Sequence, residues 1–162
     1  MDINSYFDKV YVLNLHKRAD RLSTSTERLN LCGIDFDVFG ATDGSVMRPI
    51  WESYFKDNKY FKNPNYLACA ISHLAIYKDA ISKGYERILI LEDDNKINRN
   101  INELFETTIQ QVPEDWELLY LGYIPLSDDC SMWDYNINNS NFISNNVFKS
   151  SNLWGLYSYG IK

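Results

Sequence analysis

Residues 87–94 read R-I-L-I-L-E-D-D, a run of branched apolar residues that stops at three carboxylates. The apolar residues do not alternate with polar ones, which is the pattern of a strand buried on both faces of a mostly parallel sheet. Glu92, Asp93 and Asp94 would then lie at the carboxyl end of that strand, the edge of an open α/β sheet at which ligands bind. The sequence therefore predicts an α/β fold with a site at this edge.

The three adjacent acids predict a cation. Neighbouring carboxylates repel one another, and a hard divalent ion with oxygen ligands relieves that repulsion. Mg²⁺ or Mn²⁺ held in this way keeps some waters and takes its other oxygens from the phosphates of a substrate. A polar turn that merely ends a strand has the same composition and stays open as the alternative.

Further strands and helices are expected on both sides of this stretch. Apolar patterns and capping residues predict strands at 9–15, 34–39 and 116–121, and helices at 20–31, from Asn63-Pro64 to Gly84, and at 97–111. Strand, helix and strand around the acids make a right-handed crossover the expected topology. Residues 127–146 are expected to form a long functional loop, and 147–161 contain no amphipathic helix.

Length and composition narrow the class of protein. With 162 residues the chain is expected to be one domain, 1–162, and its formal charge of -6 argues against nucleic acid as a partner. The first residues are not those of a signal peptide and there is no run of 18 apolar residues, so we expect no membrane span and a soluble, cytoplasmic protein. Three widely separated cysteines fit neither a disulfide framework nor a zinc spacing, and are expected to be reduced packing residues.

Several polar residues outside the acids are candidates for binding an anionic nucleotide. Arg18 and Arg21 lie at or before the first turn of the expected helix at 20–31, where arginine opposes the helix dipole, so they suggest a bound anion such as a diphosphate. Asp43 in the loop G-A-T-D-G could reach ribose hydroxyls. Solvated arginines and an ordinary Asp-Gly turn are the alternatives. By spacing alone, His73 on its helix is more typical of packing than of a ligand.

Four blocks taken together resemble glycosyltransferase family 25, namely V-Y-V-L-N-L-H-K-R-A-D-R-L at 10–22, G-A-T-D-G at 40–44, A-C-A-I-S-H-L-A-I-Y-K at 68–78 and I-L-I-L-E-D-D at 88–94. That family holds bacterial lipooligosaccharide galactosyltransferases and the collagen galactosyltransferases, and similar domains occur in large DNA viruses. The resemblance covers about the first 125 residues. It implies a GT-A, Rossmann-like fold, a UDP-sugar donor, Mn²⁺ or Mg²⁺, and transfer with inversion at the anomeric carbon.

The resemblance also implies roles for single residues. Glu92-Asp93-Asp94 looks like the D-x-D signature, in which the last acid binds the metal and the first reaches the donor ribose or the metal. Matches to N-L-x-x-R-x-x-R, to G-A-T-D-G and to a Ser-His pair imply donor contacts at the following positions: Asn14, Arg18, Arg21, Asp43 and His73.

The acceptor side is less defined. Inversion needs a base on the far face of the sugar. Asp128 and Asp129 are candidates, with solvated loop acids as the alternative, and Trp133 and Tyr135 could stack on a sugar or cover the core. Ala68 stands where the family commonly has Gly. Residues 154–161 resemble a G-T-x-A-Y segment that is usually followed by more chain, so we expect an acceptor side that is incomplete at the carboxyl end.

The expected function is metal-dependent transfer of galactose or glucose from a UDP-sugar to a hydroxyl of a glycan or glycoprotein acceptor. A domain that binds a nucleotide sugar or glycan without catalysing transfer is the alternative. Another nucleotide-dependent enzyme, such as a nucleotidyltransferase, is disfavoured because the first strand is not followed by a Gly-rich phosphate loop.

Overall fold

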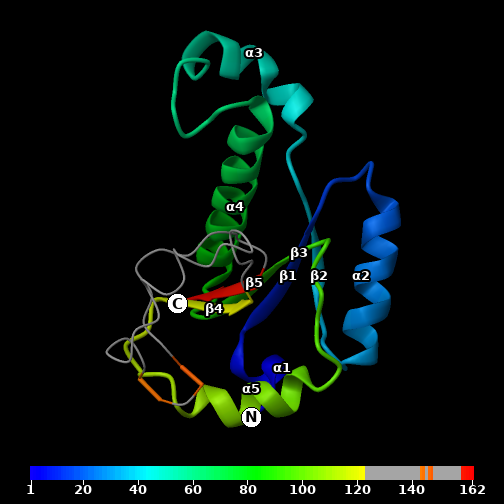
Figure 1. The fold of residues 1–162 in the computed structure, drawn as a ribbon, viewed down its shortest axis with the longest axis vertical. Coiled ribbons are helices and arrows are strands. Elements are labelled where there is room, and N and C mark those ends of the chain that lie inside the picture. The colour runs from blue at the N-terminus through cyan, green and yellow to red at the C-terminus, as the bar shows by residue number, and fades with distance from the viewer. Residues whose placement is uncertain (123–142, 145, 148–157) are drawn as a thin grey trace, which may run out of the picture.

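The computed structural model of the chain describes residues 1–122, 143–144, 146–147 and 158–162. Figure 1 shows a sheet with helices on both of its faces. In chain order the elements are α1 (Ile3–Tyr6), β1 (Lys9–Asn14), α2 (Ala19–Leu31), β2 (Asp37–Gly40), α3 (Gly44–Tyr54), α4 (Pro64–Lys83), β3 (Ile88–Glu92), α5 (Ile101–Ile109), β4 (Leu118–Gly122) and β5 (Ser158–Ile161).

The five strands form one sheet in the order β2-β1-β3-β5-β4. β2, β1 and β3 are parallel, whereas β5 runs antiparallel to both β3 and β4. The chain therefore passes from β3 through α5 to a parallel strand, as predicted, but β5 lies between the two. The α/β fold with a mostly parallel sheet is confirmed.

The end of the sheet near β4 differs from the prediction. β5 was not among the strands expected from the sequence. The strand expected at 116–121 begins at Leu118, and Leu118 is 48% exposed. The apolar residues of W-E-L-L-Y-L at 116–121 suggest a buried strand, but β4 is only partly buried because it is the edge strand of the described sheet.

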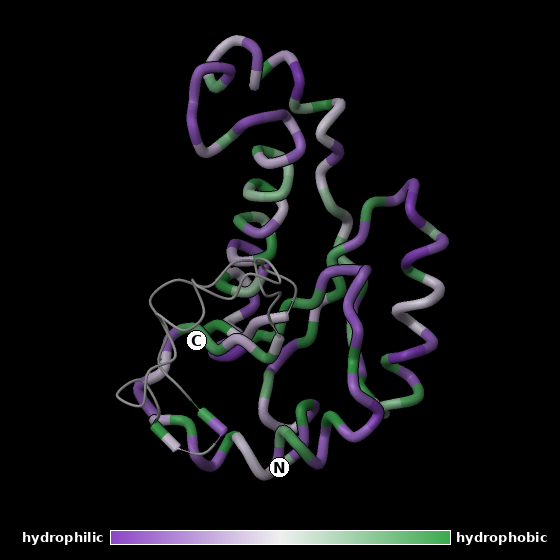
Figure 2. Tube along the Cα trace, viewed as in Figure 1, coloured by the Kyte–Doolittle hydropathy of each residue, from purple (hydrophilic) through white to green (hydrophobic). Residues whose placement is uncertain are grey.

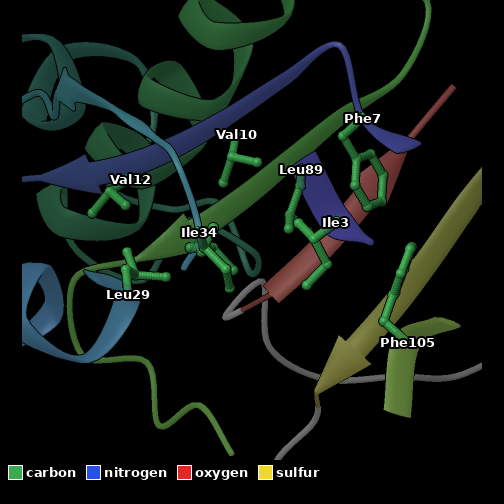
Figure 3. Close-up of a cluster of buried hydrophobic side chains, with 9 residues drawn as sticks. Ile3, Phe7, Val10, Val12, Leu29, Ile34, Leu89 and Phe105 are labelled. Carbon is green, nitrogen blue, oxygen red and sulfur yellow. The ribbon is translucent and has the colours of Figure 1, made fainter. Parts of the chain in front are cut away.

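Side chains alternate between the two faces of the central strands, so each strand supplies both halves of the core. On one face they pack with α1, α2 and α5; Figure 3 shows this cluster, which consists of Ile3, Phe7, Val10, Val12, Leu29, Ile34, Leu89, Leu91 and Phe105. On the other face they pack with α4, in a cluster of Tyr11, Leu13, Ile76, Ala80, Ile88, Ile90 and Tyr159. The run at 88–91 is buried on both faces, as its sequence predicts.

The long helix α4 begins and ends where its sequence predicts. The side chain of Asn63 accepts a hydrogen bond from the Asn65 amide, Pro64 opens the helix, and Gly84 ends it with a positive φ of 70°. Its apolar residues are not all buried, however. Leu74 and Ile81 are exposed, and Ile76 and Ala80 pack against the sheet. The polar Ser72 and His73 are also buried.

The outer helices are amphipathic. In Figure 2 the turns of α2 are mostly hydrophilic, and only Ser25 and Leu29 of this helix are buried. Figure 1 shows α3 at the end of α4 that is farther from the sheet. In the part of the chain that the structure describes, no helix is both long enough and apolar enough to cross a membrane.

Candidate functional site

The ends of β1 and β3 lie side by side, because the two strands are parallel and Leu13 pairs with Glu92. Asn14, which follows Leu13, donates its side-chain amide to Asp93 Oδ2 at 2.7 Å, and both side chains are buried. The same amide donates to the carbonyl of Arg18 at 3.1 Å. Asn14 therefore joins the two strand ends to the turn that precedes α2.

The three acids do not point to one place. Glu92 continues the series of Ile88 and Ile90 and faces α4, whereas Asp93 faces α2, because successive side chains alternate across the sheet. Asp94 lies in the turn, and its side chain is 40% exposed. The strand alternation thus separates the carboxylates that the sequence suggested as a single cluster.

Arg21 neutralises two of these acids. Its Nη1 lies 3.3 Å from Asp93 Oδ1 and 3.0 Å from Asp94 Oδ2. Arg21 belongs to the first turn of α2, so the positive end of the helix dipole reinforces its charge. In this structure Arg21 and the Asn14 amide therefore reduce the repulsion between Asp93 and Asp94, as a bound cation would also do.

The acidic turn is held in shape by a residue that sequence reasoning missed. The Asn95 side-chain amide donates to Ser25 Oγ at 2.9 Å and to the Glu92 carbonyl at 2.6 Å, and Asn95 is 4% exposed. Arg28 Nη1 donates to the Asn95 carbonyl at 2.7 Å. These bonds tie the turn to α2, so the positions of Asp93 and Asp94 are set by the same helix that carries Arg21.

Arg18 and Asp43 lie at the same edge of the sheet but have partners of their own. Arg18 holds Asp20 through two parallel hydrogen bonds of 2.9 and 2.8 Å, which lowers the pKa of Asp20 to about 2. Lys17 Nζ lies 2.6 Å from Asp43 Oδ2. That contact, with the hydrogen bonds from Ser45, lowers the pKa of Asp43 to about 2. Both acids are therefore ionised at neutral pH.

Ser72 fixes the loop that carries Asp43. Its hydroxyl accepts the Thr42 amide at 2.8 Å and donates to the Ala68 carbonyl at 2.7 Å. The Ala41 amide in turn donates to the Asn14 carbonyl at 2.8 Å. The loop is thus fastened to α4 on one side and to the end of β1 on the other.

His73 is buried on the α4 side of the sheet, 2% exposed. Its Nδ1 shares a 2.7 Å hydrogen bond with the Tyr159 hydroxyl, which is 2.6 Å from the Tyr77 hydroxyl. Burial raises the pKa of Tyr159 well above its usual value, so this hydroxyl stays protonated. Nε2 of His73 lies 3.5 Å from Glu92 Oε1.

Cys69 completes the surroundings of Glu92. Burial, and then the negative charge of Glu92, raise the pKa of its thiol to about 11. Cys69 and His73 are four residues apart on one helix, a spacing that could have identified them as a pair from the sequence. Tyr77, four residues after His73 on the same helix, could have been found in the same way, whereas Tyr159 could not, because it reaches the site only through the unpredicted strand β5.

The candidate residues thus fall into three groups at one edge of the sheet. Asn14, Arg21, Asp93 and Asp94 are in mutual contact; His73 lies beside Glu92 on the other face; Arg18 and Asp43 are nearby with separate partners. Asp128, Asp129, Trp133 and Tyr135 lie outside the described residues.

Comparison with known proteins identifies the family. A family model described as glycosyltransferase family 25 (LPS biosynthesis protein) matches residues 7–128. The chain is 26% identical over 140 residues to a glycosyltransferase 25 family member of Aedes aegypti, which covers 76% of this chain and 22% of that protein. It is 27% identical over 133 residues to procollagen galactosyltransferase 2 of Mus musculus, which covers 72% of this chain and 21% of the relative.

A third relative bears a different kind of name. Inactive glycosyltransferase 25 family member 3 of Homo sapiens is 26% identical over 131 residues, with coverage of 72% of this chain and 22% of the relative. The chain spans about a fifth of the length of these curated relatives. Since the family model covers most of the chain, including the edge of the sheet that carries the candidate site, the chain belongs to glycosyltransferase family 25.

Proposed function

We propose that this chain binds a UDP-sugar with Mn²⁺ or Mg²⁺ and transfers galactose or glucose, with inversion, to a hydroxyl of a glycan or glycoprotein acceptor. The observation that supports this most is the pairing of Arg21 with Asp94 at the carboxyl edge of the sheet, 3.0 Å apart and open to solvent. Arg21, which can bind an anion, is thus in direct contact with Asp94, which can bind a cation. A metal-bound diphosphate needs both at the same place.

The residues fit such a metal. Asp94 offers an exposed carboxylate whose described partner is Arg21, and oxygen is the ligand that hard divalent cations prefer. Asp93 is less available, because it is buried and held by Asn14 as well. In the proposal Asp94 would hold the metal, and Glu92, whose side chain lies toward His73 on α4, would be the second ligand or would contact the ribose.

The proposal assigns Arg21 an exchange of partners. In this structure Arg21 neutralises Asp93 and Asp94. A cation held by Asp94 would supply that neutralisation instead, and the Arg21 guanidinium could then bind the diphosphate through two parallel hydrogen bonds. The first turn of α2 adds its amides and dipole to this anion site. The metal supplies charge neutralisation as the nucleoside diphosphate leaves, and Arg21 and Arg18 share that task.

The resemblance supports the remaining roles. In the proposal Asp43, in the loop that Ser72 fixes, and His73, beside Glu92, contact the donor. Asp128 or Asp129 takes the proton of the acceptor hydroxyl as general base.

The experiment compares the wild-type chain with Asp94→Asn. Calorimetry with UDP and Mn²⁺ should show binding that Asp94→Asn weakens by at least about tenfold, that is about 1.4 kcal/mol. Asp37→Asn is the matched control, because Asp37 is also an exposed acid in an ion pair, with Lys9 on β1. Equal UDP and Mn²⁺ binding in wild type and Asp94→Asn would refute the metal role.

A second candidate function is binding of a nucleotide sugar or glycan without transfer. It is favoured by the human relative whose name calls it inactive. A UDP-release assay with UDP-galactose or UDP-glucose and candidate acceptors separates the two functions. Turnover that Asp94→Asn abolishes supports the transferase, whereas donor binding with no turnover for any acceptor supports the binding domain.

A further inference from the structure

A second group of metal-binding side chains lies beside the acidic turn, on the α4 side of the sheet. Cys69 and His73 share one face of α4, and Glu92 at the end of β3 faces the same helix. One ligand atom from each of the three residues lies within 4.8 Å of the other two. Among the residues that the structure describes, this is the one group of three cysteine, histidine or acidic side chains that comes so close.

The histidine offers a ligand atom that nothing else uses. His73 is 2% exposed, and its Nε2 has no hydrogen-bond partner among the described residues. Buried polar atoms without partners are rare in folded proteins, and each needs an explanation. Nε2 lies 3.5 Å from Glu92 Oε1, and the Cys69 thiol lies within 4.8 Å of a ligand atom of each of these residues.

We propose that Cys69, His73 and Glu92 bind a thiophilic divalent cation such as Zn²⁺, with a fourth position left for water. Sulfur, imidazole nitrogen and carboxylate oxygen together are a zinc donor set, and three protein ligands with one water is a common zinc geometry. Mg²⁺ and Mn²⁺ prefer oxygen alone, so the thiolate selects against them. Binding replaces the proton of the Cys69 thiol by the metal and releases that proton to solvent.

The geometry needs only a small adjustment. Metal-ligand distances of about 2.0 to 2.3 Å place tetrahedral ligand atoms roughly 3.5 Å apart. The three ligand atoms lie within 4.8 Å of one another, so their separations must close by roughly 1 Å at most. All three ligand atoms are at the ends of side chains, which can make this movement by rotation.

The other side of the His73 ring is already arranged as in known metal sites. A metal-bound histidine usually donates its second ring N–H to a fixed acceptor, which sets the tautomer. Here Nδ1 can donate to the Tyr159 hydroxyl at 2.7 Å, which in turn can donate to Tyr77 at 2.6 Å. Tyr159 is fully buried between β3 and β4, so the ring is held in place before a metal arrives.

This site is separable from the proposed donor site, although both use Glu92. Asp94 and Arg21 take no part in the second site, and Cys69 takes no part in the first. Cys69→Ser and Asp94→Asn each remove a side chain that only one of the two sites uses, so they distinguish the sites, and the shared Glu92 is left unchanged in the test.

The test uses Co²⁺ as a spectroscopic probe for the whole chain after treatment with a chelator. A thiolate-to-cobalt charge-transfer band should appear and saturate at one equivalent, and Zn²⁺ should displace Co²⁺. Cys69→Ser should abolish the band. Cys32→Ser is the matched control, because Cys32 is the other cysteine among the described residues, and it should retain the band. Asp94→Asn should also retain it. Tyr159→Phe should weaken Co²⁺ binding about 10- to 100-fold while the band remains.

The absence of a band in wild type, or a band that persists in Cys69→Ser, would overturn the proposal. A second measurement needs no substitution: Zn²⁺ should slow alkylation of Cys69 and not that of Cys32, as followed by mass spectrometry of the peptides. Equal rates at Cys69 with and without Zn²⁺ would also overturn it. If Cys69→Ser still binds UDP and Mn²⁺, the donor site does not depend on the second site, and the two proposals are tested separately.

Discussion

Nη1 of Arg21 lies 3.0 Å from Oδ2 of Asp94, so the first turn of α2 is joined to the acidic turn after β3 by an ion pair open to solvent. A diphosphate and its metal would compete for the two halves of this pair. The contact therefore connects the stability of the ligand-free site to the binding of the donor.

Arg21→Ala is expected to change nucleotide and metal binding in opposite directions. UDP affinity in the presence of Mn²⁺ should fall by about tenfold or more, because a charged hydrogen bond is worth about 1.5 to 3 kcal/mol. Affinity for Mn²⁺ alone should rise severalfold, because Asp93 and Asp94 lose the cation that neutralises them. Calorimetry with and without UDP measures both, and Arg48→Ala on α3 is the control. A fall in both affinities would contradict the exchange of partners.

Asn14→Ala should destabilise the fold, because it leaves the buried carboxylate of Asp93 without its 2.7 Å hydrogen bond. The free energy of unfolding, measured with urea, should decrease by about 1 to 3 kcal/mol. Asn4→Ala removes an amide that bonds at the exposed surface, and should cost much less. If the two variants lose similar unfolding free energies, the buried Asn14–Asp93 hydrogen bond stabilises the fold no more than an exposed one does.

Asp43 predicts a dependence of stability on pH. Its pKa is lowered from 3.8 to about 2 in the folded chain, chiefly by Lys17, so its charge stabilises the fold above about pH 4. That contribution is lost as the pH falls toward 2. Asp43→Asn keeps a side chain that can cap α3 but has no charge to lose.

Chemical denaturation at a series of pH values tests this expectation. The stability difference between wild type and Asp43→Asn should be constant above about pH 4 and should shrink between pH 4 and 2. If the stability difference does not change between pH 4 and 2, the charge of Asp43 beside Lys17 does not stabilise the folded chain.

Ser72→Ala should loosen the loop that carries Asp43. The Thr42 amide loses its acceptor, which is expected to cost about 1 to 3 kcal/mol of unfolding free energy and to weaken UDP binding. Ser82→Ala is a control on the same helix, since Ser82 bonds to a carbonyl at an exposed position. If Ser72→Ala binds UDP as well as wild type does, the loop that carries Asp43 does not contribute to the donor site.

Gly160→Ala should damage the sheet. A Cβ at this position of β5 would lie 2.7 Å from Cε1 of Phe7, whose ring is packed against Tyr6 and Phe105 and cannot easily move. Overpacking of this kind costs about 1 to 3 kcal/mol. Gly40→Ala is the control, because a Cβ there meets nothing within 4 Å. The midpoint of thermal unfolding should fall clearly in Gly160→Ala alone.

Local signals in the sequence were reliable. The apolar run at 88–91 and the Asn63-Pro64 start and Gly84 stop of α4 have causes within a few residues, and each is found in the structure. Asn14 meets the acids because β1 and β3 are parallel neighbours, which depends on strand pairing across the chain.

Features that depend on distant partners could not be predicted. In residues 158–161 only Tyr159 and Ile161 favour a strand, and the segment forms β5 because β3 and β4 offer hydrogen bonds on both sides. Ser72 and His73 are polar but buried, because the Thr42 amide, the Ala68 carbonyl and the Tyr159 hydroxyl satisfy their hydrogen bonds. Leu74 and Ile81 are apolar but exposed.

The insertion of β5 between β3 and β4 has a consequence for synthesis on the ribosome. The open side of β3 receives its partner only when residues 158–161 have left the exit tunnel, long after the first three strands are free to pair. Until then the nascent chain displays an unsatisfied backbone edge beside an apolar core, which is the surface that chaperones recognise and that promotes aggregation. Chains truncated before Ser158 should therefore be far less soluble than chains that extend through Ile161.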